Sequence, residues 1–159
     1  MLFRSRWHYD GVDFEVLHPH ADEHNAPRND SSCVLRVSGP HGRLLLAGDI
    51  ELGAEHALLA RQAQALAAEI LSVPHHGSSS SSSEAFVRAV QPRLALIAAG
   101  RHNRYHLPQA EVVARYESAG ARVMNSAGLG AISVEVLANG MHVESYRASH
   151  WGWWQQRPP

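Results

Sequence analysis

The sequence contains no lysine, a single cysteine and no apolar run approaching the roughly 20 residues of a membrane-spanning helix. Cys33 therefore has no partner for an intrachain disulfide, and the start of the chain lacks the apolar segment of a signal peptide. The 14 lysine-plus-arginine residues are all arginine, whose planar guanidinium suits phosphate. The formal net charge of -1 nevertheless excludes the strongly basic surface of a dedicated nucleic-acid binder.

The composition is otherwise that of a folded, soluble domain. With 159 residues, 45% of them hydrophobic and 18% charged, the chain is long enough to form one hydrophobic core. The 12 histidines stand out, and they cluster between the expected strands and helices. Because histidine binds metals and transfers protons near neutral pH, chemistry is expected in these loops.

Hydrophobic patterning predicts strands that alternate with helices. Alternating apolar and acidic residues predict a half-buried strand at 12–17. The elements expected after it are a hairpin of 33–37 with 44–47, a helix at 54–69, a strand at 70–73, a helix at 84–90, a strand at 94–99, a helix at 109–119, a strand at 122–124, and a hairpin of 131–137 with 141–147. The serine run 78–83 is expected to be an ordered loop whose end caps the helix at 84–90. These elements predict a mixed sheet with helices packed outside.

Metal-competent side chains follow two of the buried strands. Asp49 comes after the apolar run 44–47, and the adjacent pair His75 and His76 follows the run 70–73. Because open α/β sheets carry ligands at the carboxyl ends of their strands, we expect these side chains at one edge of the sheet. A carboxylate and two imidazoles suit zinc or manganese, and one carboxylate can bridge two metals.

Simpler interpretations of the same residues stay open. Asp49 could cap the following helix, a task that Glu51 could share. Two adjacent histidines at a strand end point in different directions, so one of His75 and His76 could bind metal while the other orients a ligand or contacts a phosphate. They could equally be a pair of surface histidines. The sequence does not decide which of the two binds metal.

A third loop, after the strand at 94–99, carries basic side chains. Arg101 and Arg104 have the guanidinium forks that hold phosphate through paired hydrogen bonds, and Ser78 is a further phosphate-binding candidate at the preceding turn. His106 is a candidate for the metal shell or for proton donation to a leaving oxygen. The alternative is a solvated basic loop.

Three ordered motifs dominate the chain: Leu46-Ala47-Gly48-Asp49-Ile50-Glu51, Val73-Pro74-His75-His76-Gly77-Ser78, and Ala98-Ala99-Gly100-Arg101-His102-Asn103-Arg104-Tyr105-His106. With the flanking segments 7–12, 29–35 and 125–132, they resemble the metallo-β-lactamase-like domain of the bacterial DNA-uptake (competence) protein ComEC. The similarity runs from about Trp7 to Tyr146. Residues 1–147 are therefore interpreted as the C-terminal part of that domain, and 148–159 as a tail.

The resemblance implies an αββα sandwich, in which two sheets pack together with helices outside. It implies that Asp49 bridges metals, that His75 or His76 is a metal ligand and that His106 is a late histidine of the site. It also places Asp30 near the metals. From the residues alone, the surroundings of Asp30 indicate only an Asx turn.

The implied function is metal-dependent phosphodiester hydrolysis of the DNA strand that is not transported during natural transformation. The implied partners are single-stranded DNA and the membrane channel and oligonucleotide-fold domains of a longer protein. That protein would lie in the inner membrane, with this domain on the periplasmic face. A hydrolase of the same fold that acts on a small ester or lactone is one alternative, and a catalytically inactive DNA-binding module is another.

Two departures from the family pattern matter. The first metal motif of the family, rich in histidine and aspartate, is expected upstream of Trp7, so several ligands would be missing here and catalysis by this chain stays an open question. The segment 18–24 nearly spells that motif, but it has one extra residue and ends about 25 residues before Asp49, so a histidine-rich surface loop is favoured. The residues 106–110 also differ from the family pattern, which leaves the role of His106 open.

Overall fold

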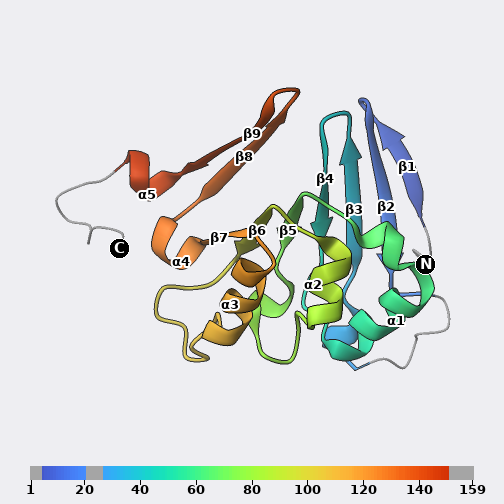
Figure 1. The fold of residues 1–159 in the computed structure, drawn as a ribbon, viewed down its shortest axis with the longest axis horizontal. Helices are drawn as coiled ribbons and strands as arrows, with labels where there is room; N and C mark the ends of the chain where they lie inside the picture. Colours follow the sequence, from blue (N-terminus) through green and yellow to red (C-terminus); the bar gives the residue numbers. More distant parts are fainter. Residues whose placement is uncertain (1–4, 21–26, 151–159) are drawn as a thin grey trace.

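A computed structural model of the protein describes residues 5–20 and 27–150. Its main sheet has the order β1 (Arg6–Tyr9), β2 (Val12–His18), β3 (Val34–Gly39), β4 (Gly42–Leu46), β5 (Ile70–Ser72), β6 (Leu94–Ile97) and β7 (Arg122–Asn125). Strands β1 to β4 pair antiparallel and β4 to β7 pair parallel, as the mixed sheet expected from the sequence requires (Figure 1). None of the helices in the described ranges is long and apolar enough to cross a membrane.

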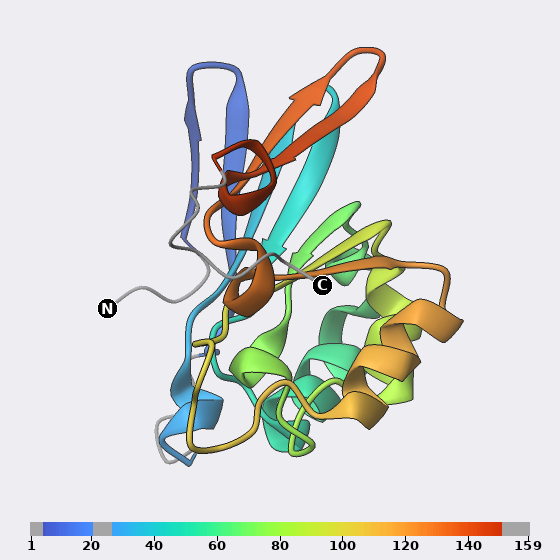
Figure 2. The same cartoon turned by 90° about the vertical axis from the view of Figure 1, so that its left-hand side faces the viewer.

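The parallel strands are connected by helices that all pack on one face of the sheet. These are α1 (Leu52–Gln62), α2 (Glu84–Val90) and α3 (Ala110–Ser118), and Figure 2 shows them gathered on the same side. The core between them is fully buried, with Leu45 and Leu71 from the sheet packed against Leu58, Phe86 and Tyr116 from the three helices. Burial of this apolar area is the main stabilising contribution to the fold.

A second β layer lies on the opposite face. Strands β8 (Ile132–Leu137) and β9 (Gly140–Ser145) form the hairpin predicted from Asn139-Gly140, and they make a separate two-stranded sheet. Val134 and Val143 pack with Ile70, Leu94 and Met124 of the main sheet. Strands β5 and β6 are therefore covered on both faces, which explains their nearly continuous apolar runs. Helix layer, main sheet and hairpin are three successive layers of the αββα architecture.

Several elements differ from the sequence prediction. Helix α1 ends at Gln62, not Glu69, and a 3-10 segment η2 (Ala63–Leu66) follows. Gln62 leaves the helical region (φ -158°) and its side chain donates to the Leu17 carbonyl (2.8 Å), which turns the chain so that Leu66 enters the core. Strand β1 was not predicted, because all four of its residues are exposed and it lacks apolar alternation. The short helices α4 (Ser126–Leu129) and α5 (Tyr146–Ser149) were also missed.

Candidate metal centre

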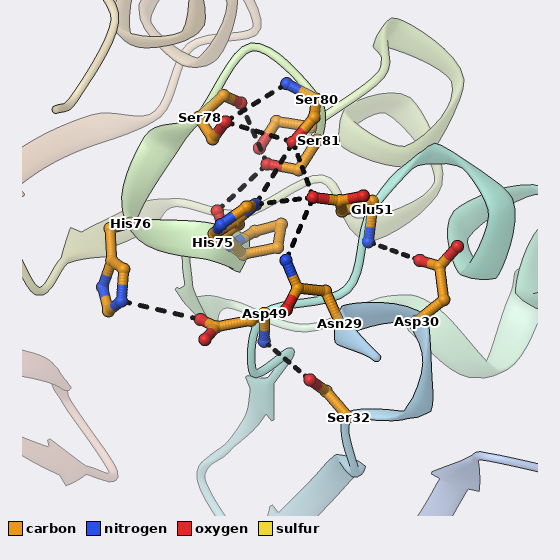
Figure 3. Close-up of polar contacts among 12 residues, drawn as sticks. Asn29, Asp30, Ser32, Asp49, Glu51, His75, His76, Ser78, Ser80 and Ser81 are labelled. Carbon is orange, nitrogen blue, oxygen red and sulfur yellow. Dashed lines mark hydrogen bonds and ion pairs between the residues drawn. The ribbon is translucent and has the colours of Figure 1, made fainter. Parts of the chain in front are cut away.

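The candidate site lies where β4 and β5 end. Asp49 follows β4 through Gly48, which has a positive φ of 60° and so permits the sharp turn. His75 and His76 belong to the 3-10 turn η3 (Pro74–Gly77) that follows β5. The backbone N–H of His75 donates to the Gly48 carbonyl (3.0 Å), so the two turns are joined directly. Figure 3 shows Asp49 beside the histidine turn, with His76 directed toward it. The predicted convergence of Asp49 with the histidine pair is thus present in the structure.

Asp49 and His76 face one another. His76 Nε2 lies 3.6 Å from Asp49 Oδ1, and both side chains are about half-exposed, at 49% and 47%. His76 Nδ1 lies 2.7 Å from the carbonyl oxygen of Ala98, which follows β6. Because a carbonyl only accepts hydrogen bonds, Nδ1 must carry a hydrogen, and in neutral imidazole Nε2 is then a lone-pair acceptor. In the neutral ring the Nε2 lone pair therefore points toward the Asp49 carboxylate, and in the protonated ring the two groups form an ion pair.

The separation of Asp49 and His76 also suits a bound metal cation. At metal–ligand bonds of about 2.1 Å, two ligands of a tetrahedral zinc ion lie roughly 3.4 Å apart, close to the observed Asp49–His76 separation. A carbonyl that receives the other ring nitrogen is also the usual second partner of a metal-binding histidine, because it fixes the tautomer and the ring plane. The described residues contain no group of three or more histidine, cysteine, aspartate or glutamate side chains able to hold a metal ion. Asp49 and His76 thus offer two ligand atoms for a metal ion.

The backbone of the histidine turn is strained. His75 and His76 both adopt left-handed conformations, with φ of 48° and 56°. For residues with a side chain, such a conformation costs of order 1–3 kcal/mol and is concentrated at functional sites. The turn is held by the bond from His75 to Gly48 and by the Ser78 N–H, which donates to the His75 carbonyl (3.0 Å). This geometry sends the two neighbouring imidazoles in different directions.

His75 contacts Glu51 instead of Asp49. Its Nδ1 lies 3.2 Å from both Glu51 Oε1 and Ser80 Oγ. The Ser80 hydroxyl donates to Glu51 Oε1 (3.1 Å), and the Asn29 amide donates to the same oxygen (3.1 Å). From the sequence, Glu51 was expected only as a possible helix cap. Its position two residues after Asp49 is the feature that could have placed it in the site. Neither Asp49 nor Glu51 caps α1 through its side chain.

Asp30 caps this helix. Only 6% of its surface is exposed, and its Oδ1 accepts the Glu51 N–H (2.7 Å). Its Oδ2 lies so close to Gly53 that a Cβ at that position would be 2.5 Å away. Both carboxylate oxygens thus face the start of α1, where the helix dipole favours negative charge. The structure brings Asp30 beneath the site through Glu51, and its role as a metal ligand stays a prediction.

The serine run forms an ordered loop, as predicted. Ser83 caps α2 by accepting the Phe86 N–H (3.2 Å). The carboxylate of Glu55, fully buried in α1, accepts the N–H groups of Ser82 and Ser83. Burial raises the pKa of Glu55, opposed by the hydrogen bonds from Ser83 and Ser82. Tyr116 donates its hydroxyl to Ser82 (2.9 Å).

Ser78 belongs to the same loop, on the side of His75. Its hydroxyl lies 3.1 Å from that of Ser80, which in turn contacts His75. The Ser78 hydroxyl is thus connected to the Glu51–His75 contact indirectly, through Ser80. Its assignment to phosphate binding is untested by this geometry.

The basic loop, residues 98–108, carries the remaining predicted site residues. It begins beside His76 at the Ala98 carbonyl and returns to Gly77, whose carbonyl accepts the Gln109 N–H (2.9 Å). Arg101, Arg104 and His106 line a hollow of about 500 Å³ in this loop. No hydrogen bond or ion pair between described residues joins His106 to Asp49 or His76. The structure therefore places His106 in the neighbouring loop, without direct contact to the Asp49–His76 pair.

The histidine-rich segment 18–24 is only partly described. His18 is buried, with 2% exposure, and its Nε2 donates to the Asp30 carbonyl (2.5 Å). The expectation of a surface loop is thus wrong for His18, which helps to hold the Asp30 turn. Residues 21–24 lie outside the described residues.

Comparison with known proteins agrees with this architecture. The family model described as Metallo-beta-lactamase superfamily matches residues 9–101, a stretch that contains Asp49 and both histidines of the turn. Competence protein ComA of Neisseria gonorrhoeae is 34% identical over 154 residues, which are 97% of this chain and 22% of that protein. Recombination protein 2 of Haemophilus influenzae is 32% identical over 148 residues, covering 93% and 18%. ComE operon protein 3 of Bacillus subtilis is 35% identical over 121 residues, covering 76% and 15%.

The chain thus spans about a fifth of the length of the curated relatives it matches. These relatives confirm the resemblance to competence proteins drawn from the three motifs. Because the family match covers more than half of the chain, the protein belongs to the metallo-beta-lactamase superfamily.

Proposed function

We propose that this chain is a metal-dependent phosphodiesterase domain of a DNA-uptake protein, which hydrolyses the DNA strand that is not transported during natural transformation. The observation that carries the proposal is the Asp49–His76 pair, in which a carboxylate oxygen faces an imidazole nitrogen whose tautomer is fixed by Ala98. Membership of a superfamily that generally binds divalent metals such as zinc supports it. The names of the competence relatives support the role in DNA uptake.

Asp49 and His76 would hold the metal, zinc or manganese, together with ligands from outside the described residues. Oxygen and nitrogen donors of this kind suit both ions. When bound, the metal would lower the pKa of water and offset negative charge on the phosphate. The carboxylate of Asp49 has a second oxygen, so it is also the group that can bridge two ions.

The remaining residues of the chain would position this pair and the substrate. Glu51 and Ser80 hold His75 away from Asp49, which leaves His75 to orient the turn or to contact a phosphate. Arg101 and Arg104, with Ser78, would contact the phosphates of the strand. His106, exposed in the basic loop, would donate a proton to the leaving oxygen if a bound strand brings it close.

The proposal extends to the protein of which this domain would form part. Relatives about five times as long are consistent with additional domains, and we propose a membrane channel and an oligonucleotide-fold domain in the same protein. The domain would act on the periplasmic face of the inner membrane, where the incoming strands separate. Single-stranded DNA would be its partner.

The test uses a version of the protein extended at its N-terminus. Metal content and cleavage of single-stranded DNA with manganese or zinc are measured for the extended protein and for its Asp49→Asn and His76→Ala variants. We expect bound metal and cleavage in the parent, and loss of both in the variants, because each change removes a direct ligand. His142→Ala is the matched control, since this exposed histidine of β9 contacts only Glu144 among the interactions described for it (3.0 Å).

Two outcomes would contradict the proposal. Cleavage of lactones while single-stranded DNA stays intact would make the domain a small-ester hydrolase of the same fold. An extended protein that binds DNA but takes up no metal would make it a non-catalytic binding module.

A further inference from the structure

The basic loop contains a paired arginine and tyrosine at its exposed tip. From Ala98 to Ala110 the chain has two arginines and two histidines and no acidic residue, although the whole chain has a formal net charge of -1. Tyr105 is 61% exposed. The guanidinium carbon of Arg104 lies 4.8 Å from the centre of the Tyr105 ring, and Arg104 Nη2 donates to the Tyr105 hydroxyl (2.6 Å). The arginine therefore fixes the plane of an aromatic ring that is largely in solvent.

This loop is preorganised by Asn103. The Asn103 amide donates to the carbonyls of Gly100 (2.9 Å) and Leu107 (2.8 Å), and its oxygen accepts the Leu107 N–H (2.8 Å). One side chain thus ties both ends of the tip together. A binding loop held in one conformation loses less conformational entropy when a ligand binds, so it binds more tightly than a mobile loop with the same contacts.

We infer that Tyr105 is a stacking platform for an unpaired nucleobase, with Arg104 holding the ring and contacting the adjacent phosphate. Stacking of a base on an aromatic side chain is independent of sequence, because every base has a π face. In a duplex the bases are already stacked on one another, so an exposed ring at a protein surface gains much less. The loop would therefore make the domain selective for single-stranded over double-stranded DNA.

The inference rests on the proposed function and specifies its substrate class. The basic loop starts at the carbonyl that orients His76 and ends against Gly77, where a Cβ would lie 2.6 Å from Pro108. Tyr105 therefore stands on a loop whose two ends contact the histidine turn, and a strand stacked on Tyr105 would extend from that loop toward the Asp49–His76 pair. An exposed tyrosine elsewhere on the surface is not expected to bind the same strand. Tyr9 is such a residue, because it is 73% exposed and belongs to β1, at the opposite edge of the main sheet (Figure 1).

The test measures DNA binding by the 159-residue chain itself, without added metal. A single-stranded oligonucleotide that carries 2-aminopurine, and the duplex made from it, are titrated with the parent protein and its variants. For Tyr105→Ala we expect about tenfold weaker binding of the single strand, since the change removes the ring on which a base stacks. Binding of the duplex is expected to stay within about twofold. Tyr105→Phe should retain the parent affinity, and Tyr9→Ala is the matched control.

Salt dependence separates stacking from charge. Tyr105→Ala removes no charge, so the slope of log affinity against log salt concentration should not change, whereas Arg104→Gln should reduce it by about one phosphate contact. Replacing single nucleotides by abasic sites should weaken binding to the parent and have no further effect on Tyr105→Ala. The inference is overturned if the chain binds neither oligonucleotide, or if Tyr105→Ala weakens single strand and duplex equally.

Cleavage by the N-terminally extended protein distinguishes this inference from the proposed function. If Tyr105→Ala weakens single-strand binding but the extended protein cleaves no DNA, the stacking site stands and the hydrolytic function fails. If the extended protein cleaves single-stranded DNA and Tyr105→Ala changes neither affinity nor KM, the function stands and the stacking site is refuted.

Discussion

The polar groups on the two sides of the η3 turn are built in opposite ways. On the side of the serine loop, Glu55 is fully buried and both of its oxygens accept backbone N–H groups. On the side of the sheet edge, Asp49 and His76 are about half-exposed, and their facing atoms lie 3.6 Å apart, farther than a hydrogen bond. The same short segment thus separates a buried, fully hydrogen-bonded polar network from a half-exposed pair of side chains in looser contact.

The difference distinguishes groups that build the fold from groups that are available for chemistry. A buried polar network stabilises a protein only when each member has its hydrogen-bond partners, and the serine loop meets that condition through Glu55 and Tyr116. Asp49 and His76 are about half-exposed and 3.6 Å apart, and an exposed ion pair of this kind contributes little to stability. Natural sequences break local rules mainly where function requires it.

The largest expected effect is on stability, from removing the two carboxylates in turn. Glu55→Ala should lower the free energy of unfolding by about 3 kcal/mol, because it leaves the buried N–H groups of Ser82 and Ser83 without their acceptor. Asp49→Ala, on the other side of the turn, should change it by less than about 0.5 kcal/mol. Urea denaturation at neutral pH measures both values. Equal losses in the two variants would show that Asp49 stabilises the fold as much as Glu55 does.

A smaller effect is expected at Gly53, beneath the turn. Alanine normally stabilises a helix by about 1 kcal/mol relative to glycine. At Gly53, however, a Cβ would lie 2.5 Å from Asp30 Oδ2 and displace the carboxylate that caps α1. Gly53→Ala should therefore lower stability by about 1 kcal/mol, the usual value of a cap. Gly128→Ala in α4, where a Cβ meets nothing within 4 Å, is the control, and thermal unfolding compares the two.

The sequence predicted the parts of this molecule that depend on local chemistry. Apolar runs that are buried on both faces, such as that of β6, specify strands wherever they occur in a sheet. Asn139-Gly140 specified a hairpin, and Ser83 specified a cap, because each effect acts over two or three residues. The meeting of Asp49 with the histidine pair followed from strand order alone, since parallel strands end at one edge.

The parts that failed depend on contacts between distant segments. Nothing in the residues near Asp30 shows that its carboxylate reaches the start of α1, 21 positions away in the sequence. The different contacts of His75 and His76 are set by Glu51 and by the Ala98 carbonyl, which follow different strands. The first helix was also predicted to end too late in the sequence, because the chain turns at Gln62 through a hydrogen bond to the distant Leu17 carbonyl.

The smallest expected effect is the pH dependence contributed by Glu55. Burial raises its pKa above the ordinary value of 4.5, so the folded chain holds the proton more tightly than the unfolded chain does. The resulting contribution to stability is fully present below pH 4.5 and is lost as the pH rises through the pKa of the folded state. In the Glu55→Gln variant this dependence is absent. The difference in free energy of unfolding between wild type and variant, measured by urea denaturation across this range, should therefore move against the wild type as the pH rises. A shift in the opposite direction would show that the N–H groups of Ser82 and Ser83 outweigh the cost of burying the charge, and that this carboxylate is held ionised inside the fold.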